Sequence, residues 1–216
     1  MMDAERTERR AILRIALAMD AAGFAPSKSG NVSCRCGDGF LVTPSALPYA
    51  ETAPADLVWL DLDGKILSGD RPPSSEWRFH AAIYRARPQV EAIVHTHSPR
   101  ATALSAARRG IPAFHYMVAI AGGADIRCAP YATFGTEELS RNAVTALEGR
   151  KAVLLANHGV IATGANLDAA WGLAREVENL ASQYLDLLAS GLDPVLLDEA
   201  EMTRVLAQFA TYGRKG

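Results

Sequence analysis

The chain begins and ends with segments whose apolar residues are spaced as on an α-helix. Within residues 3–22 apolar side chains recur three and four positions apart, and Gly23 follows where a C-terminal cap is expected. In the middle of the chain, Thr136 precedes two acidic residues, which is typical of a helix start. These patterns predict helices over residues 3–22, 76–86, 99–108, from Thr136 onward, 167–189 and 198–212, with Ser74 or Ser75 as N-cap of the second.

Between these segments the period shortens to that of β-strands. Strand-forming residues on both sides of glycine-containing turns predict two hairpins, formed by residues 31–36 with 40–43 and by residues 58–61 with 65–67. Further strands are predicted over residues 90–96, 152–156 and 160–163. Because regular βαβ alternation is missing, we expect an α/β fold of the α+β type. It comprises a single domain over residues 1–216, with a central, mostly antiparallel or mixed sheet flanked by helices.

Composition narrows the class of protein. The 22 basic and 24 acidic residues leave a net charge of −2, so the chain lacks the overall positive field with which proteins bind nucleic acid. No apolar run approaches the ~20 residues of a membrane span, and the N-terminal residues form no export signal. Three cysteines cannot form a closed disulfide framework. We therefore expect a cytoplasmic protein without nucleic-acid or membrane partners.

Three histidines follow predicted strands at positions where their side chains can meet. His95 and His97 end an apolar run, and residues two apart in a strand point to the same face. His158 follows the apolar strand over residues 152–156 and precedes Gly159. Three imidazoles with a fourth position open to water or substrate are a ligand set of catalytic zinc. The pattern therefore favours a catalytic metal site at neighbouring strand ends.

A closed zinc site that only stabilises the fold is the alternative. Such a site needs a fourth thiolate or imidazole, but Cys34-Arg35-Cys36 lacks the spacing of a zinc knuckle and Cys128 is isolated. We interpret the cysteines as small core or strand residues. We do not assign His80 or His115 as metal ligands, because either can be structural. His80 lies inside a predicted helix, and His115 lies beside Tyr116.

Polar residues elsewhere have two interpretations each. Glu76 near its helix start stabilises the helix by about 0.3–1 kcal/mol without any function, but beside a metal its carboxylate is suited to proton transfer. Ser74 and Ser75 are either caps or donors of an anion site. The runs Lys28-Ser29-Gly30-Asn31 and Thr43-Pro44-Ser45 are either plain turns or phosphate-binding loops.

The lysines argue against imine chemistry. Only four are present, and none lies in an apolar run that lowers the pKa of its amine, as a Schiff-base lysine requires. We therefore prefer metal-based chemistry for any reaction at a carbonyl group.

Longer motifs, taken in chain order, carry a family resemblance. They are Gly30-Asn31-Val32-Ser33, Pro73-Ser74-Ser75-Glu76-Trp77-Arg78-Phe79-His80, the strand with His95 and His97, residues 112–123, Ala129-Pro130-Tyr131-Ala132-Thr133-Phe134-Gly135-Thr136 and Asn157-His158-Gly159. On these motifs the chain resembles the class II, zinc-dependent sugar-phosphate aldolases of the aldolase/adducin superfamily, in particular the L-fuculose-phosphate aldolases. The resemblance extends from residue 30 to the end of the chain.

The resemblance implies a set of roles for individual residues. His95, His97 and His158 would bind one Zn²⁺ per subunit, or another divalent metal. Glu76 would be both a metal ligand in the resting enzyme and the acid/base, and Tyr116 the proton donor near the aldehyde oxygen. Phosphate would be held by Gly30, Asn31, Ser45, Ala46, Ser74 and Ser75, and the aldehyde side would be shaped by Phe134, Phe209 and Tyr212.

The same resemblance implies the fold, assembly and reaction. The family has a mostly antiparallel sheet flanked by helices, and its members are usually homotetramers with sites at subunit boundaries. The implied reaction is reversible cleavage of a ketose 1-phosphate, of the L-fuculose 1-phosphate type, to dihydroxyacetone phosphate and an aldehyde such as L-lactaldehyde. It proceeds through an enediolate that zinc stabilises.

Two departures and several alternatives accompany this resemblance. Ala46 replaces a family glycine, and its backbone N–H can still bind phosphate if its φ stays negative. Asn157 stands where the fuculose branch has histidine, and this difference bears on the identity of the aldehyde product. The alternatives are an aldolase for 5-deoxyribulose or 5-methylthioribulose 1-phosphate in salvage, a methylthioribulose-phosphate dehydratase and a ribulose-phosphate 4-epimerase, which Glu76 in place of aspartate disfavours. A non-catalytic adducin-like interaction module is less favoured because the histidines and Glu76 are all present.

Overall fold

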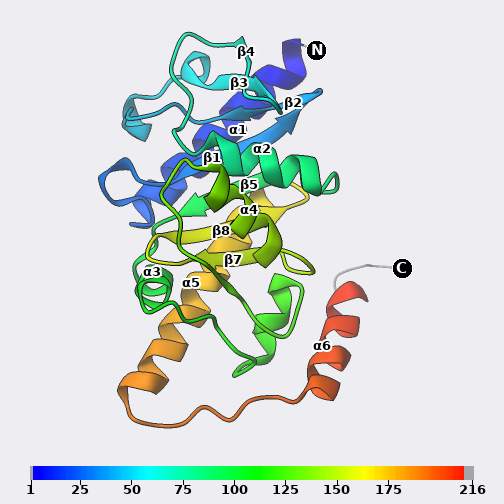
Figure 1. Cartoon of the computed structure of the whole chain (residues 1–216). Helices are drawn as coiled ribbons and strands as arrows, with labels where there is room; N and C mark the ends of the chain where they lie inside the picture. Colours follow the sequence, from blue (N-terminus) through cyan, green and yellow to red (C-terminus); the bar gives the residue numbers. More distant parts are fainter. Residues whose placement is uncertain (1, 212–216) are drawn as a thin grey trace.

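One eight-stranded sheet forms the middle of the molecule (Figure 1). In this computed structural model, which describes residues 2–211, the strand order is β4-β3-β2-β1-β5-β8-β7-β6. Neighbouring strands are antiparallel except β6 and β7, so the prediction of a mostly antiparallel or mixed sheet is confirmed. The strands are β1 (Asn31–Cys36), β2 (Gly39–Val42), β3 (Val58–Asp61), β4 (Ile66–Ser68), β5 (Ala92–Thr96), β6 (Cys128–Ala129), β7 (Ala152–Leu155) and β8 (Gly159–Gly164).

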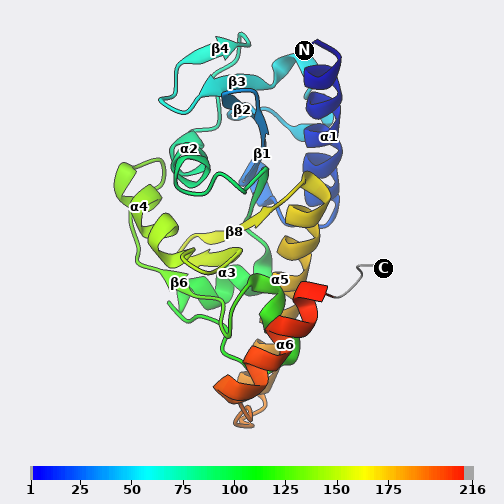
Figure 2. The same ribbon diagram turned by 90° about the vertical axis from the view of Figure 1, so that its right-hand side faces the viewer.

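Helices cover both faces of this sheet. Figure 2 shows α1 and α5 on one side of the strands and α2 and α4 on the other. The α-helices are α1 (Met2–Ala21), α2 (Trp77–Ala86), α3 (Pro99–Ala106), α4 (Glu137–Ala146), α5 (Leu167–Ala189) and α6 (Glu199–Thr211). The described part of the chain also forms the 3-10 helices η1 (Pro26–Lys28), η2 (Tyr49–Glu51), η3 (Pro54–Asp56) and η4 (Tyr116–Ala121). Among the described residues, none of the helices has the length and apolar character needed to cross a membrane.

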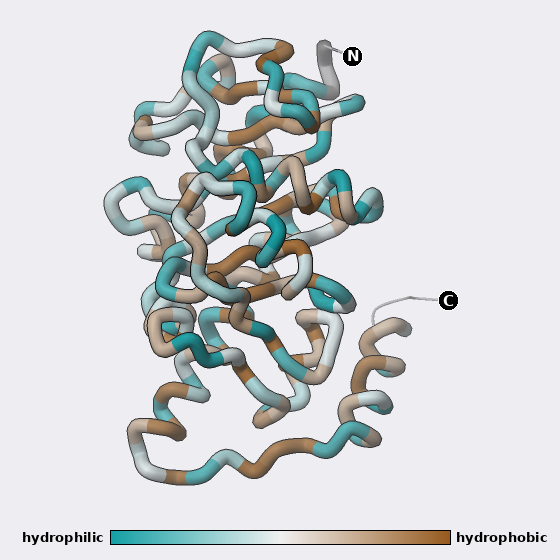
Figure 3. The backbone as a smooth tube through the Cα atoms, in the orientation of Figure 1, coloured by the Kyte–Doolittle hydropathy of each residue, from teal (hydrophilic) through white to brown (hydrophobic). Residues whose placement is uncertain are grey.

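Alternating side chains of the central strands supply two apolar clusters, one on each face. In β8, Val160 packs with the helices α1 and α5 on one face, whereas Ile161 packs with α2 and α4 on the other. The neighbouring strand β5 divides in the same way, with Val94 on the first face and Ile93 on the second. The hydropathy colouring of Figure 3 shows the apolar segments running through these inner strands. A sheet buried on both faces holds strand ends rigidly, which matters for residues placed there.

Some predicted boundaries were wrong. Helix α2 begins at Trp77 with Glu76 as N-cap residue, and no serine caps it. The Ser74 hydroxyl accepts instead from the backbone N–H of Glu76 at 3.3 Å, which forms a turn just ahead of the helix. The short elements β6 and η4 were not predicted because neither is long enough to show a period.

Candidate metal centre

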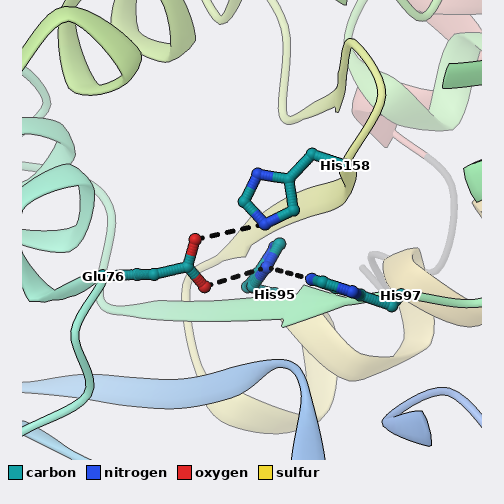
Figure 4. Close-up of side chains that lie close together, drawn as sticks. All are labelled: Glu76, His95, His97 and His158. Atoms are coloured by element: carbon teal, nitrogen blue, oxygen red, sulfur yellow. Dashed lines mark hydrogen bonds and ion pairs between the residues drawn. The ribbon is translucent and has the colours of Figure 1, made fainter. Parts of the chain in front are cut away.

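Four side chains that can each give one ligand atom to a metal ion meet between β5 and the start of α2 (Figure 4). They are Glu76, His95, His97 and His158, and their candidate ligand atoms all lie within 4.8 Å of one another. His95 Nε2 lies 3.2 Å from Glu76 Oε2 and 3.0 Å from His97 Nε2. His158 Nε2 lies 3.1 Å from Glu76 Oε1. Neighbouring strand ends thus bring the three imidazoles together, and the N-terminus of a helix adds a carboxylate.

Strand pairing explains this convergence. β5 pairs with β1 on one side and β8 on the other, and His158 lies in the turn that leads from β7 into β8. Gly159 begins β8 so close to the neighbouring strand that a Cβ atom there would lie 2.4 Å from the carbonyl oxygen of Thr96. Glycine is therefore required at this position for the turn with His158 to approach the strand with His95.

Hydrogen bonds around the cluster leave lone pairs directed at its centre. His95 Nδ1 lies 2.8 Å from the carbonyl oxygen of Val160, and because a carbonyl only accepts, Nδ1 carries the proton and Nε2 the lone pair. Glu76 Oε1 is buried and accepts no hydrogen bond from the residues that the structure describes. Imidazole nitrogens and a carboxylate oxygen in this arrangement are the donors that Zn²⁺ prefers. The residues therefore fit a divalent cation.

The protonation states of two of these groups also suit metal binding. Burial by itself raises the pKa of Glu76, but the imidazoles of His95 and His158 outweigh burial and hold that pKa well below its usual range. Burial, together with the neighbouring imidazoles of His95 and His158, lowers the pKa of His97 to about 3. The carboxylate stays ionised and the imidazole neutral, which are the forms that bind metal ions.

The cluster borders a cavity of about 320 Å³. The loops before α2 and after β2 are tied together beside it, since Ser74 N–H donates to the Thr43 carbonyl and Ser45 N–H to the Pro72 carbonyl, both at 3.0 Å. All six residues expected around a phosphate line this cavity, as does Phe134: Gly30, Asn31, Ser45, Ala46, Ser74 and Ser75. The structure adds lining residues to which we gave no individual role in binding phosphate: Lys28, Ser29, Pro44, Tyr131, Ala132 and Asn157. Each belongs to a run quoted above, so membership of the run was the available signal.

The backbone of Ala46 does not meet the condition of a negative φ that we set for phosphate binding by its N–H. Its φ is +60°, in the left-handed region. A Cβ in that conformation approaches the following carbonyl oxygen and costs roughly 1–2 kcal/mol. The loop after β2 is held by the bridge between Pro44 and Pro73, so the backbone keeps the conformation that suits glycine although alanine occupies the position.

Two residues expected on the aldehyde side lie outside the cavity of the single chain. Tyr116 and Phe209 stack on each other, with ring centroids 6.5 Å apart, and neither is among the described residues that line the cavity. Tyr116 is 52% exposed to solvent. Tyr212 lies outside the described residues.

The cysteines and the two histidines left off the metal are placed elsewhere in the fold. Cys34, Cys36 and Cys128 are free and belong to strands, as we expected. His115 precedes η4 and accepts a hydrogen bond from a backbone N–H two residues later. His80 is fully buried in α2, where burial and the nearby His95 lower its pKa to about 3.

Fold and site together define a class of protein. It is an α+β protein with a candidate metal centre of three histidines and one glutamate beside a cavity. The family model described as "Class II Aldolase and Adducin N-terminal domain" matches residues 10–185, and this chain belongs to that family. Its relatives are named aldolases, which are lyases, so the chain is a class II aldolase and the predicted enzyme class is confirmed.

Curated relatives cover nearly the whole chain. A "5-methylthioribulose-1-phosphate/5-deoxyribulose-1-phosphate aldolase" of Rhodospirillum rubrum is 53% identical over 205 residues, covering 95% of this chain and 92% of the relative. An "L-fuculose phosphate aldolase" of Escherichia coli K12 is 49% identical over 205 residues, covering 94% of each. Among solved structures, an "L-fuculose 1-phosphate aldolase" superposes with a TM-score of 0.91 at 37% identity, covering 94% of this chain and 96% of that one.

Ala46→Gly is expected to stabilise the protein. Removing the Cβ at φ +60° relieves roughly 1–2 kcal/mol, of which the greater freedom of glycine in the unfolded chain cancels about 0.5–1 kcal/mol. The free energy of unfolding should therefore rise by about 0.5–1 kcal/mol in urea titrations. Ala53→Gly, at a φ of −90°, is the matched control and should lower it. A loss of stability in Ala46→Gly would contradict the strained backbone.

His80 is expected to make stability fall in acid. The unfolded chain takes up a proton on this residue below about pH 6.5, but the folded chain does so only near pH 3. The free energy of unfolding therefore falls as pH is lowered through this window, by about 1.4 kcal/mol per pH unit from His80 alone. His80→Gln cannot titrate, so urea unfolding with chelator present should give a flatter pH curve between pH 6 and 4. Parallel curves for the two proteins would argue against a neutral buried His80.

Proposed function

We propose that this chain is a divalent-metal-dependent aldolase that reversibly cleaves a ketose 1-phosphate to dihydroxyacetone phosphate and an aldehyde. The observation that carries the proposal is the cluster of Glu76, His95, His97 and His158 at the wall of a cavity that serine side chains and Lys28 also line. Zinc, one ion per subunit, is the proposed metal because three imidazoles and a carboxylate suit it. When bound, the metal supplies a Lewis acid for the negative charge that cleavage leaves on the ketone half.

The phosphate end of the substrate is proposed to lie among fixed donors of the same cavity. Ser45, Ser74 and Ser75 offer hydroxyl groups there, and Gly30 leaves room for close approach of a phosphate to the backbone. Asn31 and Ala46 complete the set, and Lys28 adds a positive charge at the rim. Binding the phosphate away from the reacting bond orients the substrate and makes the reaction effectively intramolecular.

Glu76 is proposed to carry the proton between substrate and enzyme. Its Oε2 accepts a hydrogen bond from Asn31 Nδ2 at 3.0 Å, which leaves Oε1 as the oxygen that exchanges a proton. In synthesis, the ionised Glu76 carboxylate takes a proton from the carbon of the ketone half on Oε1, this carbon bonds to the aldehyde carbon, and the aldehyde oxygen is protonated. Cleavage runs these steps in reverse and begins with Glu76 protonated on Oε1.

A neighbouring subunit is proposed to complete the aldehyde side. Tyr116 and Phe209 are stacked outside the cavity of their own chain, and Tyr116 is half exposed. In a homotetramer with sites at subunit boundaries, Tyr116 of an adjacent subunit receives the hydroxyl proton during cleavage and returns it during synthesis. Phe134, which is 64% exposed at the cavity, lies where such a subunit would cover it, and we assign Tyr212 to the same side. We place this enzyme in the cytoplasm.

An L-fuculose 1-phosphate-like substrate, giving L-lactaldehyde or a similar aldehyde, is the first candidate. It is supported by the TM-score of 0.91 to the "L-fuculose 1-phosphate aldolase" structure. The second candidate is 5-methylthioribulose or 5-deoxyribulose 1-phosphate, supported by the 53% identity to the Rhodospirillum rubrum enzyme of that name. The candidates share the phosphate and the metal-binding oxygens and differ only at the aldehyde end.

A coupled assay for dihydroxyacetone phosphate tests this proposal. Zinc-loaded protein is given L-fuculose, 5-deoxyribulose, 5-methylthioribulose and L-ribulose 1-phosphates in turn. We expect release that a chelator abolishes and added zinc restores. The kcat/KM of the preferred substrate should exceed that of each other substrate by about tenfold or more. A tenfold difference corresponds to about 1.4 kcal/mol of transition-state stabilisation. Absence of release from every member would overturn the aldolase assignment in favour of a dehydratase, an epimerase or a binding role.

Glu76→Gln is expected to fold but to turn over slowly. The amide cannot carry the proton, so kcat should fall by about 10²–10⁴-fold. Turnover, zinc content and melting temperature are measured together with those of Glu138→Gln, an exposed glutamate of α4 that should behave as wild type. Unchanged turnover in a zinc-loaded Glu76→Gln protein would remove this residue from its proposed role.

A further inference from the structure

A line of buried polar side chains runs from Glu76 into the protein, away from the cavity. Asn31 Nδ2 lies 3.0 Å from Glu76 Oε2, and Asn31 Oδ1 lies 2.5 Å from His80 Nε2. Beyond it, Ser33 Oγ lies 2.7 Å from His80 Nδ1 and 2.8 Å from the hydroxyl of Tyr84. All five side chains are buried. Nothing in the cleavage reaction described above uses the last three.

The periods of a helix and a strand explain why these side chains interleave. Glu76, His80 and Tyr84 are four residues apart along α2, where four residues rise about 6 Å. Asn31 and Ser33 are two apart in β1, where two residues advance about 6.6 Å. Because the two repeats nearly match, one stripe of the helix can mesh with one face of the strand.

Chemistry fixes the direction of every hydrogen bond in this line. The carboxylate of Glu76 only accepts, so Asn31 presents its NH₂ group there and its amide oxygen to His80. That oxygen only accepts, so His80 carries its proton on Nε2, and its Nδ1 accepts from the Ser33 hydroxyl. The Ser33 oxygen in turn accepts from the Tyr84 hydroxyl. Every donor points toward Glu76.

The outer end of the line is closed by Arg35, two residues after Ser33. Its guanidinium lies 4.9 Å from the centre of the Tyr84 ring and donates to the carbonyl oxygens of Tyr84 and Val90. Near the other end, the rings of Phe79 and Phe40 stack on His80. In these apolar surroundings a polar group without a hydrogen bond costs stability. Breaking one hydrogen bond of the line therefore disfavours the arrangement of its neighbours.

We propose that His80, oriented by Ser33 and Tyr84, is a positioning residue that sets the orientation of the Asn31 amide and thereby fixes the Glu76 carboxylate. A reversed amide would direct its oxygen at the carboxylate, and the His80 N–H prevents this. The proposal rests on the function proposed above, because it assigns these residues to the metal ligand and proton carrier of that reaction. Of the residues proposed to bind phosphate, it involves Asn31 alone.

Four variants test the line at separate points. His80→Leu removes the donor to Asn31, whereas His80→Gln places an amide N–H near the position of Nε2 and should restore part of the function. Ser33→Ala and Tyr84→Phe remove hydroxyls farther out. Ser140→Ala and Tyr184→Phe are matched controls, since both are buried on helices outside the cavity lining.

Three readouts are compared for every protein: zinc affinity by titration with zinc alone, kcat and KM on the best substrate, and the His80 tautomer from ¹⁵N chemical shifts. We expect His80→Leu to lose about 10–100-fold in zinc affinity, in the range of other residues that orient metal ligands. Its kcat should fall about tenfold or more while KM changes by less than about threefold. Ser33→Ala and Tyr84→Phe should lose less zinc affinity and less kcat than His80→Leu. His80→Gln should keep a higher zinc affinity and a higher kcat than His80→Leu.

The outcomes separate this proposal from the proposed function. If His80 in the wild-type protein carries its proton on Nδ1, the proposed line of hydrogen bonds is overturned, whether or not the enzyme cleaves a substrate. Variants that match the controls in zinc affinity and kcat would overturn the positioning role in an active enzyme. If no substrate is cleaved, the proposed function fails, and zinc affinity together with the tautomer then decides the positioning role alone. Melting temperatures identify any variant that is merely misfolded, and His80→Gln replaces His80→Leu in that case.

Discussion

The burial of an ionised carboxylate among three imidazoles is the constraint on which the rest of this structure depends. Taking the Glu76 carboxylate out of water costs several kcal/mol unless its oxygens find partners. Asn31 donates a hydrogen bond to Oε2, and the imidazole nitrogens of His95 and His158 lie 3.2 and 3.1 Å from the two carboxylate oxygens. These three residues come from β1, β5 and the β7–β8 turn. The order β1-β5-β8 in the sheet is thus a condition for the site. The sheet brings these segments together although they lie far apart in the sequence.

The contact between α2 and β1 serves the core and the site at once. One face of β1 gives Val32 and Cys34 to the apolar cluster under α1, whereas its other face buries Asn31 and Ser33 against α2. Polar residues on alternate positions usually mark the solvent side of a strand. In β1 both faces are buried, and the polar face is tolerated because each group on it is hydrogen-bonded.

Residues with a local signal could be predicted, and those that depend on tertiary contacts could not. Helix α5 has the predicted bounds because 23 residues show the helical period clearly. His95 and His97 were found because strand spacing places them on one face. A single histidine inside a helix carries no such mark, so the role proposed for His80 was missed; its spacing of four from Glu76 and Tyr84 was the only signal. The positive φ of Ala46 depends on a loop held by distant Pro73, which no local pattern encodes.

Burial divides the residues of the proposed active site into two groups. The buried group carries out the reaction, and the exposed group determines which aldehyde is accepted. The carboxylate and His95 are buried, and they are held by strands packed on both faces. On the aldehyde side, Phe134 and Tyr131 are exposed at the cavity, and Tyr116 is proposed to come from another subunit. Exposed side chains change with little cost in stability, whereas a change in the buried cluster disturbs every partner. This division agrees with the different substrate names of two relatives that are each near 50% identical to this chain.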